Sequence, residues 1–339
     1  MATLSGKVLI TGGAGFIGSH LAERLVAEGC HVTVIDNLSS GTRENLAAVE
    51  DSVQLIVGRL ADVLRDEKVD LRTFKYIFHL AANAYVPPSV ADPLGDFHTT
   101  LENTILVLDA LRRLAPPGNG ASANWPKRGE LPLLVNMSSA AVYGNPITLP
   151  ISETAPTVPL SPYGVSKLGG ERYVAVYSRL YGVRAVSIRL FSAYGPRQRK
   201  QVVYDLIAKV RKNPERVDLV GDGTQSRDFM YISDVIDALL LVANAGVEDG
   251  SVYNLASGES KTIAELLKTI VSLSKCNPEI CYSGSVRSGD ADRWEASIDK
   301  IAQLGFKAKV GISEGLAKTL AWYDQSRLET APAGEGVPT

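Results

Sequence analysis

The amino-acid sequence predicts an α/β protein with a doubly wound parallel sheet, followed by a smaller lobe. Short apolar segments alternate with amphipathic segments of helical length, beginning with the apolar run at 7–11. A glycine-rich turn separates this run from the amphipathic stretch at 17–28. Strands that alternate with helical crossovers form a parallel sheet with helices on both faces, which is the fold class we expect.

The expected elements follow one another through the first 190 residues. Short apolar runs predict strands at 7–11, 31–35, 53–57, 76–80, 133–137 and 185–190. Apolar residues at helical spacing predict helices at 17–28, 94–114 and 163–180. The segment at 116–131 is rich in Pro, Gly, Ser and Asn. It predicts a surface excursion, because it is longer than the usual connection of about 2–6 residues.

The pattern becomes less regular after residue 190, which predicts a second unit. Helices are expected near 202–211, 235–245 and 263–272, with a strand at 217–220. We therefore divide the chain into three parts. Residues 1–190 form the doubly wound domain, residues 191–328 form mainly the smaller lobe, with some segments shared between the two, and residues 329–339 form a tail.

Composition excludes several classes of protein. Of the 339 residues, 45% are hydrophobic and 21% are charged, as in ordinary globular chains. The 35 basic residues nearly balance the 37 acidic ones, so the net charge of −2 provides no positive field for nucleic-acid phosphates. No apolar run approaches the roughly 20 residues of a membrane span. We expect a cytoplasmic enzyme without a nucleic-acid or membrane partner.

The cysteines and histidines predict neither a disulfide framework nor a metal site. Cys30, Cys276 and Cys281 are too few and too scattered for such a framework, which fits a reducing compartment. No two of the four histidines share the spacing of metal ligands, so packing or solvation explains each of them better.

A glycine pattern between the first strand and the first helix predicts a dinucleotide site. Gly12, Gly15 and Gly18 allow the backbone to approach a pyrophosphate, which the helix N-terminus attracts. The second strand ends in Asp36, 18 residues after Gly18. A carboxylate there can bind the ribose hydroxyls of adenosine and repel a 2′-phosphate, so we expect NAD rather than NADP. The alternatives are a plain tight turn for the glycines and a helix cap for Asp36.

Tyr163 and Lys167 form the candidate catalytic pair. They are four residues apart, so a helix places both on one face. A phenol is a poor base at neutral pH, but an adjacent ammonium and a nicotinamide cation would lower its pKa. Ser139 ends a strand and could form a hydrogen bond with a reacting hydroxyl. The alternative for the pair alone is an exposed helix surface.

Ordered motifs along almost the whole chain carry a family resemblance. They occur at 11–18, 36–41, 79–82, 138–144, 163–167, 194–197, 227–229 and 287–290. With them the sequence resembles the extended short-chain dehydrogenase/reductase family, in particular its NAD-dependent nucleotide-sugar epimerases and dehydratases, and most of all the UDP-glucose 4-epimerases. The resemblance implies a Rossmann domain with a C-terminal substrate-binding lobe, and a catalytic triad of Ser139, Tyr163 and Lys167.

The resemblance also implies which residues bind the NAD cofactor. They are Gly12, Gly15, Phe16, Ile17, Gly18, Asp36, Asn37, Ser39, Ser40, Gly41, Leu60, Leu80, Ala81, Ala82, Tyr163, Lys167 and Phe191. Two positions depart from the family pattern. Arg59 replaces an acidic residue that resembles an adenine contact in the family. Thr100 replaces an Asn that in the family often lies on the nicotinamide side.

The implied substrate is a UDP-sugar. Arg227 and Arg287 match positions that contact its diphosphate, and the Arg guanidinium suits phosphate oxygens. Asp290 resembles a ribose ligand, and Leu219 a wall against the base. Trp294 matches a residue that controls the room for a C2 substituent, which favours UDP-glucose and UDP-galactose over their N-acetylated forms. The remaining expected sugar contacts are Ser139, Tyr163, Ser192 and Arg199.

The residues after Ser139 separate the possible reactions. Dehydratases of the family carry Asp-Glu there and the UDP-glucuronate decarboxylases keep a Glu, whereas this chain has Ala140 and Ala141. We therefore expect 4-epimerisation of a UDP-hexose through a 4-keto intermediate. Ser192 followed by Arg199 resembles the carboxylate pocket of UDP-glucuronate 4-epimerases, which is the first alternative. The others are a nucleotide-sugar dehydratase or dehydrogenase, and a catalytically silent NAD-binding regulator. A family-like homodimer through 94–114 and 163–180 is expected.

Overall fold

The computed structural model describes residues 3–83, 86–114, 131–284 and 292–330. The expected surface excursion at 116–131 and tail at 329–339 lie almost wholly outside these ranges. Seven parallel strands form the central sheet in the order β10-β6-β5-β4-β1-β2-β3, which confirms the predicted fold class. The strands are β1 (Lys7–Thr11), β2 (His31–Asp36), β3 (Val53–Val57), β4 (Tyr76–His79), β5 (Leu133–Ser139), β6 (Ala185–Leu190) and β10 (Asp249–Leu255).

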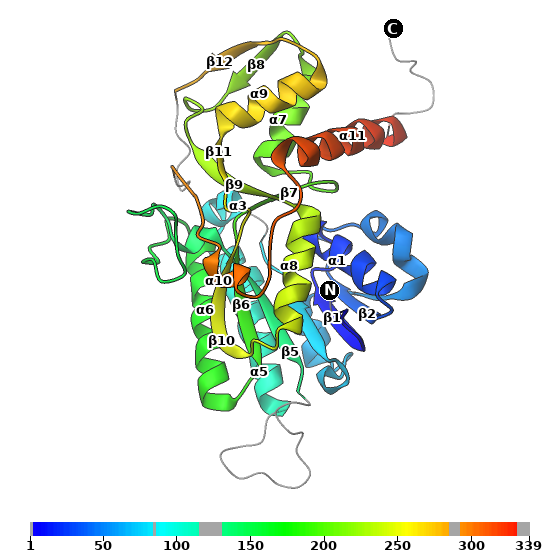
Figure 1. The fold of residues 1–339 in the computed structure, drawn as a ribbon. Helices are drawn as coiled ribbons and strands as arrows, with labels where there is room; N and C mark the ends of the chain where they lie inside the picture. The colour runs from blue at the N-terminus through cyan, green and yellow to red at the C-terminus, as the bar shows by residue number, and fades with distance from the viewer. Residues whose placement is uncertain (1–2, 84–85, 115–130, 285–291, 331–339) are drawn as a thin grey trace.

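The strands are buried on both faces, as their apolar runs predict. On β1, Val8 and Ile10 pack into the core beneath one helical layer, while Leu9 between them packs into the core beneath the other. The first layer holds α1 (Phe16–Ala27) and α8 (Ile232–Asn244). The second holds α2 (Leu60–Arg65), α5 (Glu102–Leu114) and α6 (Pro162–Tyr181). Figure 1 shows the sheet between these layers.

The order of the strands places a switch point next to β1. Leu9 pairs with Thr33 of β2 on one side and with Ile77 of β4 on the other. The chain therefore leaves the carboxyl ends of β1 and β4 in opposite directions. This is where open parallel sheets bind their ligands.

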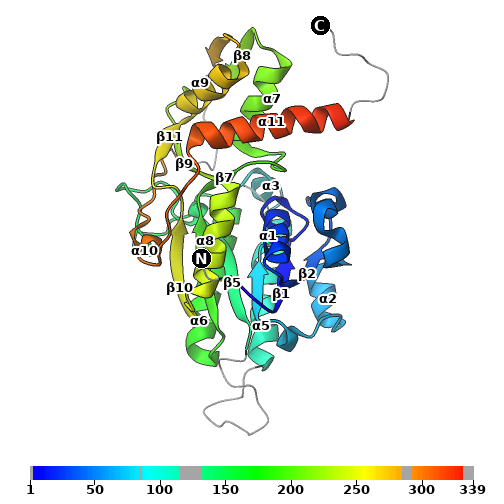
Figure 2. The ribbon, with the colours of Figure 1, turned by 45° about the vertical axis from the view of Figure 1, so that its right-hand side comes forward.

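The smaller lobe lies above the carboxyl ends of the sheet, as Figures 1 and 2 show. Its strands form one three-stranded sheet, β11-β9-β7, and one two-stranded sheet, β12-β8. The lobe comprises β7 (Ser192–Tyr194), α7 (Gln201–Lys212), β8 (Arg216–Leu219), β9 (Ser226–Tyr231), β11 (Ser260–Thr262), α9 (Ile263–Ser274), β12 (Glu279–Tyr282) and α11 (Ile312–Thr330). The short helix α10 (Asp299–Ala302) packs against β10 of the main sheet. The helices and the strand predicted after residue 190 are all present, while α8 and β10 pack with the main sheet.

The helix predicted at 94–114 is not uniform. It consists of α4 (Pro93–Asp96), a π-helical turn η3 (Phe97–Leu101) and α5. The short elements α3 (Val86–Ala91), η1 (Arg43–Ser52), η2 (Leu71–Thr73) and η5 (Ala140–Val142) complete the fold. Single π turns inside α-helices are rare and frequently mark functional sites, and this one faces the cavity region described below.

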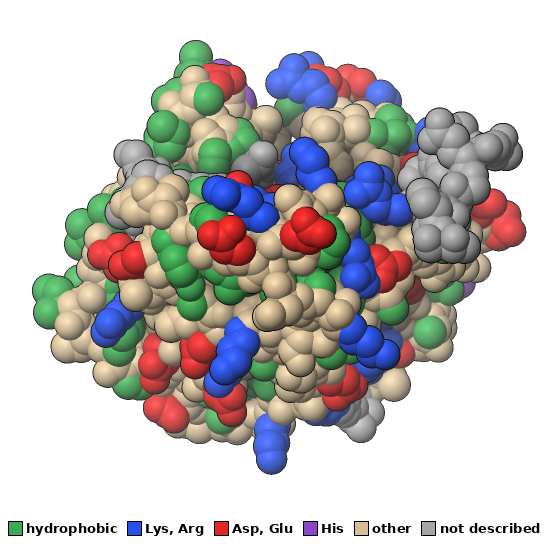
Figure 3. All heavy atoms as spheres, turned by 90° about the horizontal axis from the view of Figure 1, so that it is seen from above, with side chains coloured by type: hydrophobic (Ala, Val, Ile, Leu, Met, Phe, Trp, Pro, Cys, Tyr) green, Lys and Arg blue, Asp and Glu red, His purple; other side chains and the backbone are tan. Residues whose placement is uncertain are grey.

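Charged side chains of both signs are interspersed on the face that Figure 3 shows, in keeping with the balanced composition. Within the described ranges, no helix combines the length and apolarity needed to cross a membrane. The same ranges hold no cluster of three or more His, Cys, Asp or Glu side chains suited to a metal ion.

Candidate active site

A cavity of about 580 Å³ lies at the switch point, between the carboxyl ends of the sheet and the smaller lobe. The glycine turn after β1 and the tip of β2 line one end, which we call the cofactor end. Residues of the lobe line the other end, which we call the sugar end. The end of β5 and the first turns of α6 lie between them.

Gly12 and Gly18 of the glycine turn have no room for a side chain. Gly12 has a φ of +73°, and a Cβ atom there would lie 2.8 Å from the backbone nitrogen of Ala81. A Cβ atom on Gly18 would lie only 2.3 Å from the carbonyl oxygen of Gly12. Gly15 caps α1, so the N-terminus of this helix faces the cavity. The turn therefore fits the close backbone approach that a dinucleotide pyrophosphate requires.

Asp36 ties the glycine turn to the loop that follows β2. Its carboxylate accepts hydrogen bonds from the backbone nitrogens of Ala14, at 2.9 Å, and Leu38, at 2.8 Å. The carbonyl oxygen of Ala14 in turn accepts a hydrogen bond from Asn45 Nδ2, at 2.9 Å. Asp36 is buried, lines the cavity and caps no helix, so its charge faces the cofactor end.

The structure brings all but one of the expected cofactor residues to the cavity wall. Those that line it are Gly12, Gly15, Phe16, Ile17, Gly18, Asp36, Asn37, Ser39, Ser40, Leu60, Leu80, Ala81, Ala82, Tyr163, Lys167 and Phe191. Gly41 packs behind the wall, where a Cβ atom would lie 2.6 Å from the carbonyl carbon of Ala14. The two departures also lie off the wall: Arg59 caps α2, and Thr100 is buried in η3.

Ser139, Tyr163 and Lys167 converge at the middle of the cavity. Ser139 ends β5, and its hydroxyl accepts a hydrogen bond from the backbone nitrogen of Ala141. Tyr163 lies in the first turn of α6, and its hydroxyl is near enough to the Ser139 side chain for that side chain to lower the Tyr163 pKa. Lys167 follows one turn later, with its Nζ atom 5.8 Å from the centre of the Tyr163 ring and 2.7 Å from the carbonyl oxygen of Met137.

Burial shifts the pKa values of both titratable members of this group. The loss of solvent around its hydroxyl raises the pKa of Tyr163 to about 12, against the opposing hydrogen bond from Ser139. Burial lowers the pKa of Lys167 to about 8, and the negative charges of Asp96 and Glu171 oppose that fall. Tyr163 is therefore a protonated phenol at neutral pH in this state. A further positive charge in the cavity would favour its phenolate.

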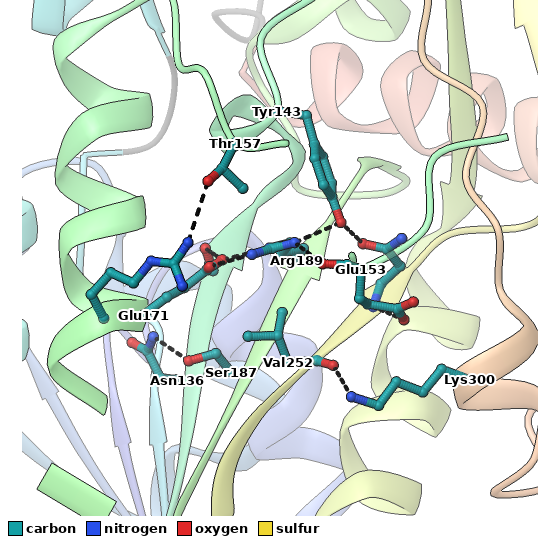
Figure 4. Close-up of polar contacts among 12 residues, drawn as sticks. Asn136, Tyr143, Glu153, Thr157, Glu171, Ser187, Arg189, Val252 and Lys300 are labelled. Atoms are coloured by element: carbon teal, nitrogen blue, oxygen red, sulfur yellow. Dashed lines mark hydrogen bonds and ion pairs between the residues drawn. The ribbon is translucent and has the colours of Figure 1, made fainter. Parts of the chain in front are cut away.

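A buried ionic network around Glu171, which lies one turn after Lys167 on α6, adjoins this group, and Figure 4 shows part of that network. The Arg189 guanidinium donates to both carboxylate oxygens of Glu171, at 2.9 and 2.7 Å, and to the Tyr143 hydroxyl at 2.8 Å. Ser138 donates to the same carboxylate at 2.5 Å, and Tyr143 donates to Asn254 at 2.6 Å. The hydrogen bonds and charge of Glu171 raise the pKa of Arg189 despite its burial. The carboxylate of Glu171 is thus fully paired.

The sugar end combines cationic and aromatic side chains. Ser192, Arg199, Leu219, Arg227 and Trp294 all line it. The Arg227 guanidinium lies 4.9 Å from the centre of the Trp294 ring, and Trp294 Nε1 donates to the carbonyl oxygen of Gly144 at 3.0 Å. Phe191 contacts the same indole edge to face, with ring centres 6.2 Å apart. Arg287 and Asp290 lie outside the described residues.

Several polar residues of the cavity wall were not predicted from the sequence, and Asn83, Gln225 and Asp292 are among them. Asn83 follows β4, Gln225 precedes β9, and Asp292 lies just before Trp294. A position just past the carboxyl end of β4 is a ligand position in parallel sheets, and that rule could have indicated Asn83. Gln225 and Asp292 carry no comparable signal, because the fold of the lobe alone brings them to the wall.

Comparisons with known proteins agree with this geometry. The sequence signature of the "NAD dependent epimerase/dehydratase family" matches residues 8–256. A protein named UDP-glucose 4-epimerase from Mycolicibacterium smegmatis is 32% identical over 323 residues, which cover 94% of this chain and 98% of the relative.

Two solved structures have similar folds. The UDP-N-acetylglucosamine 4-epimerase of Methanobrevibacter ruminantium, in complex with UDP-N-acetylmuramic acid, superposes with a TM-score of 0.83 at 31% identity, covering 95% of this chain and 99% of that one. The UDP-glucuronic acid 4-epimerase of Bacillus cereus, in complex with UDP-glucuronic acid and NAD, gives 0.81 at 28% identity, covering 94% and 99%. The signature and the 32% identical relative each span most of the sequence, and the chain therefore belongs to the NAD-dependent epimerase/dehydratase family.

Proposed function

We propose that the protein catalyses the reversible 4-epimerisation of a UDP-hexose, with UDP-glucose and UDP-galactose preferred, and retains its NAD through the cycle. The observation that carries this proposal is the convergence of Ser139, Tyr163 and Lys167 in the middle of one cavity. A glycine turn suited to a dinucleotide lies on one side of them, and Arg227 lies on the other.

The side chains divide the chemistry among themselves. The glycine turn and Asp36 would hold NAD, which would supply the hydride chemistry at C4 of the sugar. Tyr163, as a phenolate, takes the proton of the C4 hydroxyl and later returns it. The Lys167 ammonium favours that phenolate and holds the nicotinamide ribose, while Ser139 polarises the reacting oxygen. The 4-keto sugar turns over in the cavity before it is reduced on its other face.

The wall next to Ser139 supports epimerisation over dehydration. Ala140 and Ala141 follow Ser139 in the short turn η5, and both are buried. Neither side chain titrates, whereas elimination of water needs an acid and a base beside the sugar. Tyr163 can carry the single proton transfer that epimerisation at C4 needs, without an acid or base at positions 140 and 141.

A second candidate is the 4-epimerisation of UDP-glucuronate. Ser192 and Arg199 both line the sugar end, where a hydroxyl and a guanidinium could bind a C6 carboxylate. The structural similarity to a UDP-glucuronic acid 4-epimerase supports this candidate. Arg199 is exposed, and its charge also interacts with that of Glu44 in η1.

A panel of UDP-sugars tests the proposal. The purified protein is incubated with UDP-glucose, UDP-galactose, their N-acetylated forms and UDP-glucuronate, and the products are separated by chromatography. Interconversion of the first two without added NAD and without a lasting rise in absorbance at 340 nm is the expected result. Net release of NADH, or of a dehydrated sugar, would instead identify a dehydrogenase or a dehydratase. Turnover of UDP-glucuronate alone would select the second candidate.

We further propose that two copies of the chain associate through α5 and α6 and the turn before them. These helices pack on each other, and several large apolar side chains on their outer surface are exposed. They are Leu94, Phe97, Val165, Tyr173, Val176 and Leu180. Exposed apolar patches of this kind typically mark association surfaces. A dimeric mass is expected in light scattering, and a monomeric mass would reject this arrangement.

A further inference from the structure

Asp96 is a buried carboxylate with unusual partners. It ends α4 directly before the π-helical turn η3, and only 2% of its surface is exposed. Ser166 Oγ donates to Asp96 Oδ2 at 2.7 Å, Asn83 Nδ2 donates to Oδ1 at 3.1 Å, and Thr100 Oγ1 donates to Oδ1 at 3.4 Å. In the described part of the chain these donors are all neutral, whereas a buried carboxylate ordinarily has a cationic partner.

The donors connect Asp96 with the active site from two sides. Ser166 lies on α6 directly before Lys167 and three residues after Tyr163. Asn83 lines the cavity, and its backbone nitrogen donates to Thr100 Oγ1 at 3.1 Å. The π turn thus brings Asp96 and Thr100 against both α6 and the loop after β4. Thr100 belongs to this cluster and does not itself line the cavity.

Among the charged and titratable groups described around Lys167, Asp96 is the carboxylate whose charge can balance the ammonium. Glu171 of α6 is the other nearby carboxylate, but the Arg189 guanidinium of β6 neutralises it. Tyr163 is neutral without a further cation, and burial lowers the pKa of His79 on β4 to about 3, so its imidazole is neutral too. The Lys167 Nζ atom otherwise donates to the backbone oxygen of Met137.

We propose that Asp96 is a positioning residue whose negative charge keeps the Lys167 ammonium charged and whose hydrogen bonds fix α6 against the cofactor end of the cavity. The inference rests on the proposed function, because it acts through Tyr163 and Lys167. Loss of the charge, with the shape retained, lowers the pKa of Lys167, and it lowers the pKa of Tyr163 as well, since the charge of Asp96 raises both.

A double-mutant cycle tests the charge coupling without any turnover. The variants are Asp96→Asn, Lys167→Met and the double variant, unfolded in urea at several pH values with NAD in fixed excess. Below the pKa of Lys167 its side chain is a buried ammonium that the Asp96 carboxylate stabilises. Above that pKa the amine is neutral and gains nothing from the carboxylate. We expect the loss in the folding equilibrium constant caused by Asp96→Asn to be about tenfold larger at pH 6 than at pH 9. In the Lys167→Met background this pH dependence should disappear.

Asp92→Asn is the matched control, because Asp92 caps the same helix α4 with a carboxylate on the exposed surface. Its effect should not change between pH 6 and pH 9. If Asp96→Asn does not fold, Asp96→Ser removes the same charge in a smaller side chain and should give the same pH dependence. A pH-independent loss in the cycle, equal in both Lys167 backgrounds, overturns the proposal.

The pH dependence of kcat gives a second readout. The acid limb reports the ionisation of Tyr163 and the alkaline limb that of Lys167, so Asp96→Asn should move both limbs to lower pH. A uniform fall of kcat with unmoved limbs would mean that Asp96 is only structural. Should no UDP-sugar turn over with the wild type, the proposed function fails, and the unfolding cycle still decides the role of Asp96.

Discussion

The two ends of the cavity are built in different ways. At the cofactor end, the hydrogen bonds join Ala14 with Asp36, 22 residues on at the tip of β2, and with Asn45, 31 residues on in η1. At the sugar end, Trp294 donates to the carbonyl oxygen of Gly144, 150 residues away. The first end depends on a glycine turn whose backbone is held by side chains close to it in sequence, and the second on side chains from distant segments. Changes at the two ends should therefore separate cofactor binding from sugar selection.

The charges also differ. Asp36 places a carboxylate at the cofactor end, whereas Arg199 and Arg227 place guanidinium groups at the sugar end. A negative group suits ribose hydroxyls, and positive groups suit a sugar diphosphate. Tyr163 and Lys167 lie in the middle of the cavity. A substitution there can slow the reaction of the sugar while the cofactor and the UDP-sugar still bind.

The largest effect is expected in the middle of the cavity. Tyr163→Phe keeps the aromatic ring and removes the proposed base. Turnover should fall by roughly 10²- to 10⁴-fold, the usual contribution of general acid–base catalysis. The NAD content of the purified variant should equal that of the wild type, because the cofactor end is unchanged. Near-normal turnover would mean that another group takes the proton.

A large loss of stability is expected behind the sugar end. Arg189→Met leaves the Glu171 carboxylate buried without its cation, and it removes the donor to Tyr143, which neighbours Gly144. Breaking a buried ion pair in this way typically costs about 3–5 kcal/mol, which urea unfolding would measure.

Arg172→Met is the control for that variant. Arg172 is exposed on α6 and forms a hydrogen bond with Thr157 at 3.5 Å, so its loss should change the free energy of unfolding by less than about 0.5 kcal/mol. Equal effects of the two substitutions would contradict a stabilising role for the contacts of Arg189 with Glu171 and Tyr143, which Figure 4 shows.

An intermediate effect is expected at the cofactor end. The 2′-phosphate of NADP would lie against the buried Asp36 carboxylate, and like charges a few ångströms apart repel by a few kcal/mol. The affinity for NADP should be lower by roughly 100-fold. Extraction of the purified protein should release NAD, and recovery of mainly NADP would show that Asp36 does not select the cofactor.

The smallest effect is expected for sugar selection. The Trp294 indole fills part of the sugar end, and overfilling a packed site costs about 1–3 kcal/mol. Trp294→Ser should therefore raise the kcat/KM of the N-acetylated sugars relative to UDP-glucose and UDP-galactose by roughly tenfold. If the wild type already uses the N-acetylated sugars well, or if Ser brings them no relative gain, Trp294 is not the gate.

Much of the cofactor end could be predicted from the sequence. The glycine spacing, the acid at the tip of β2 and the four-residue separation of Tyr163 and Lys167 are local patterns. A strand, a tight turn and a helix each impose a fixed geometry on neighbouring residues. The sequence by itself therefore determined the parallel sheet, the glycine turn after its first strand and the shared helix face of Tyr163 and Lys167.

The tertiary structure alone decided the rest. The strand β10 follows β7, β8 and β9 of the smaller lobe in the sequence, yet it pairs with β6 in the main sheet. The π turn η3 interrupts a segment whose apolar spacing predicts one continuous helix. The burial of Asp96 among neutral donors, and the contact of Trp294 with Gly144, depend on segments 70 and 150 residues apart. Local periodicity cannot encode such contacts, because the electrostatic environment of a charge is set by whichever distant groups the packing brings to it.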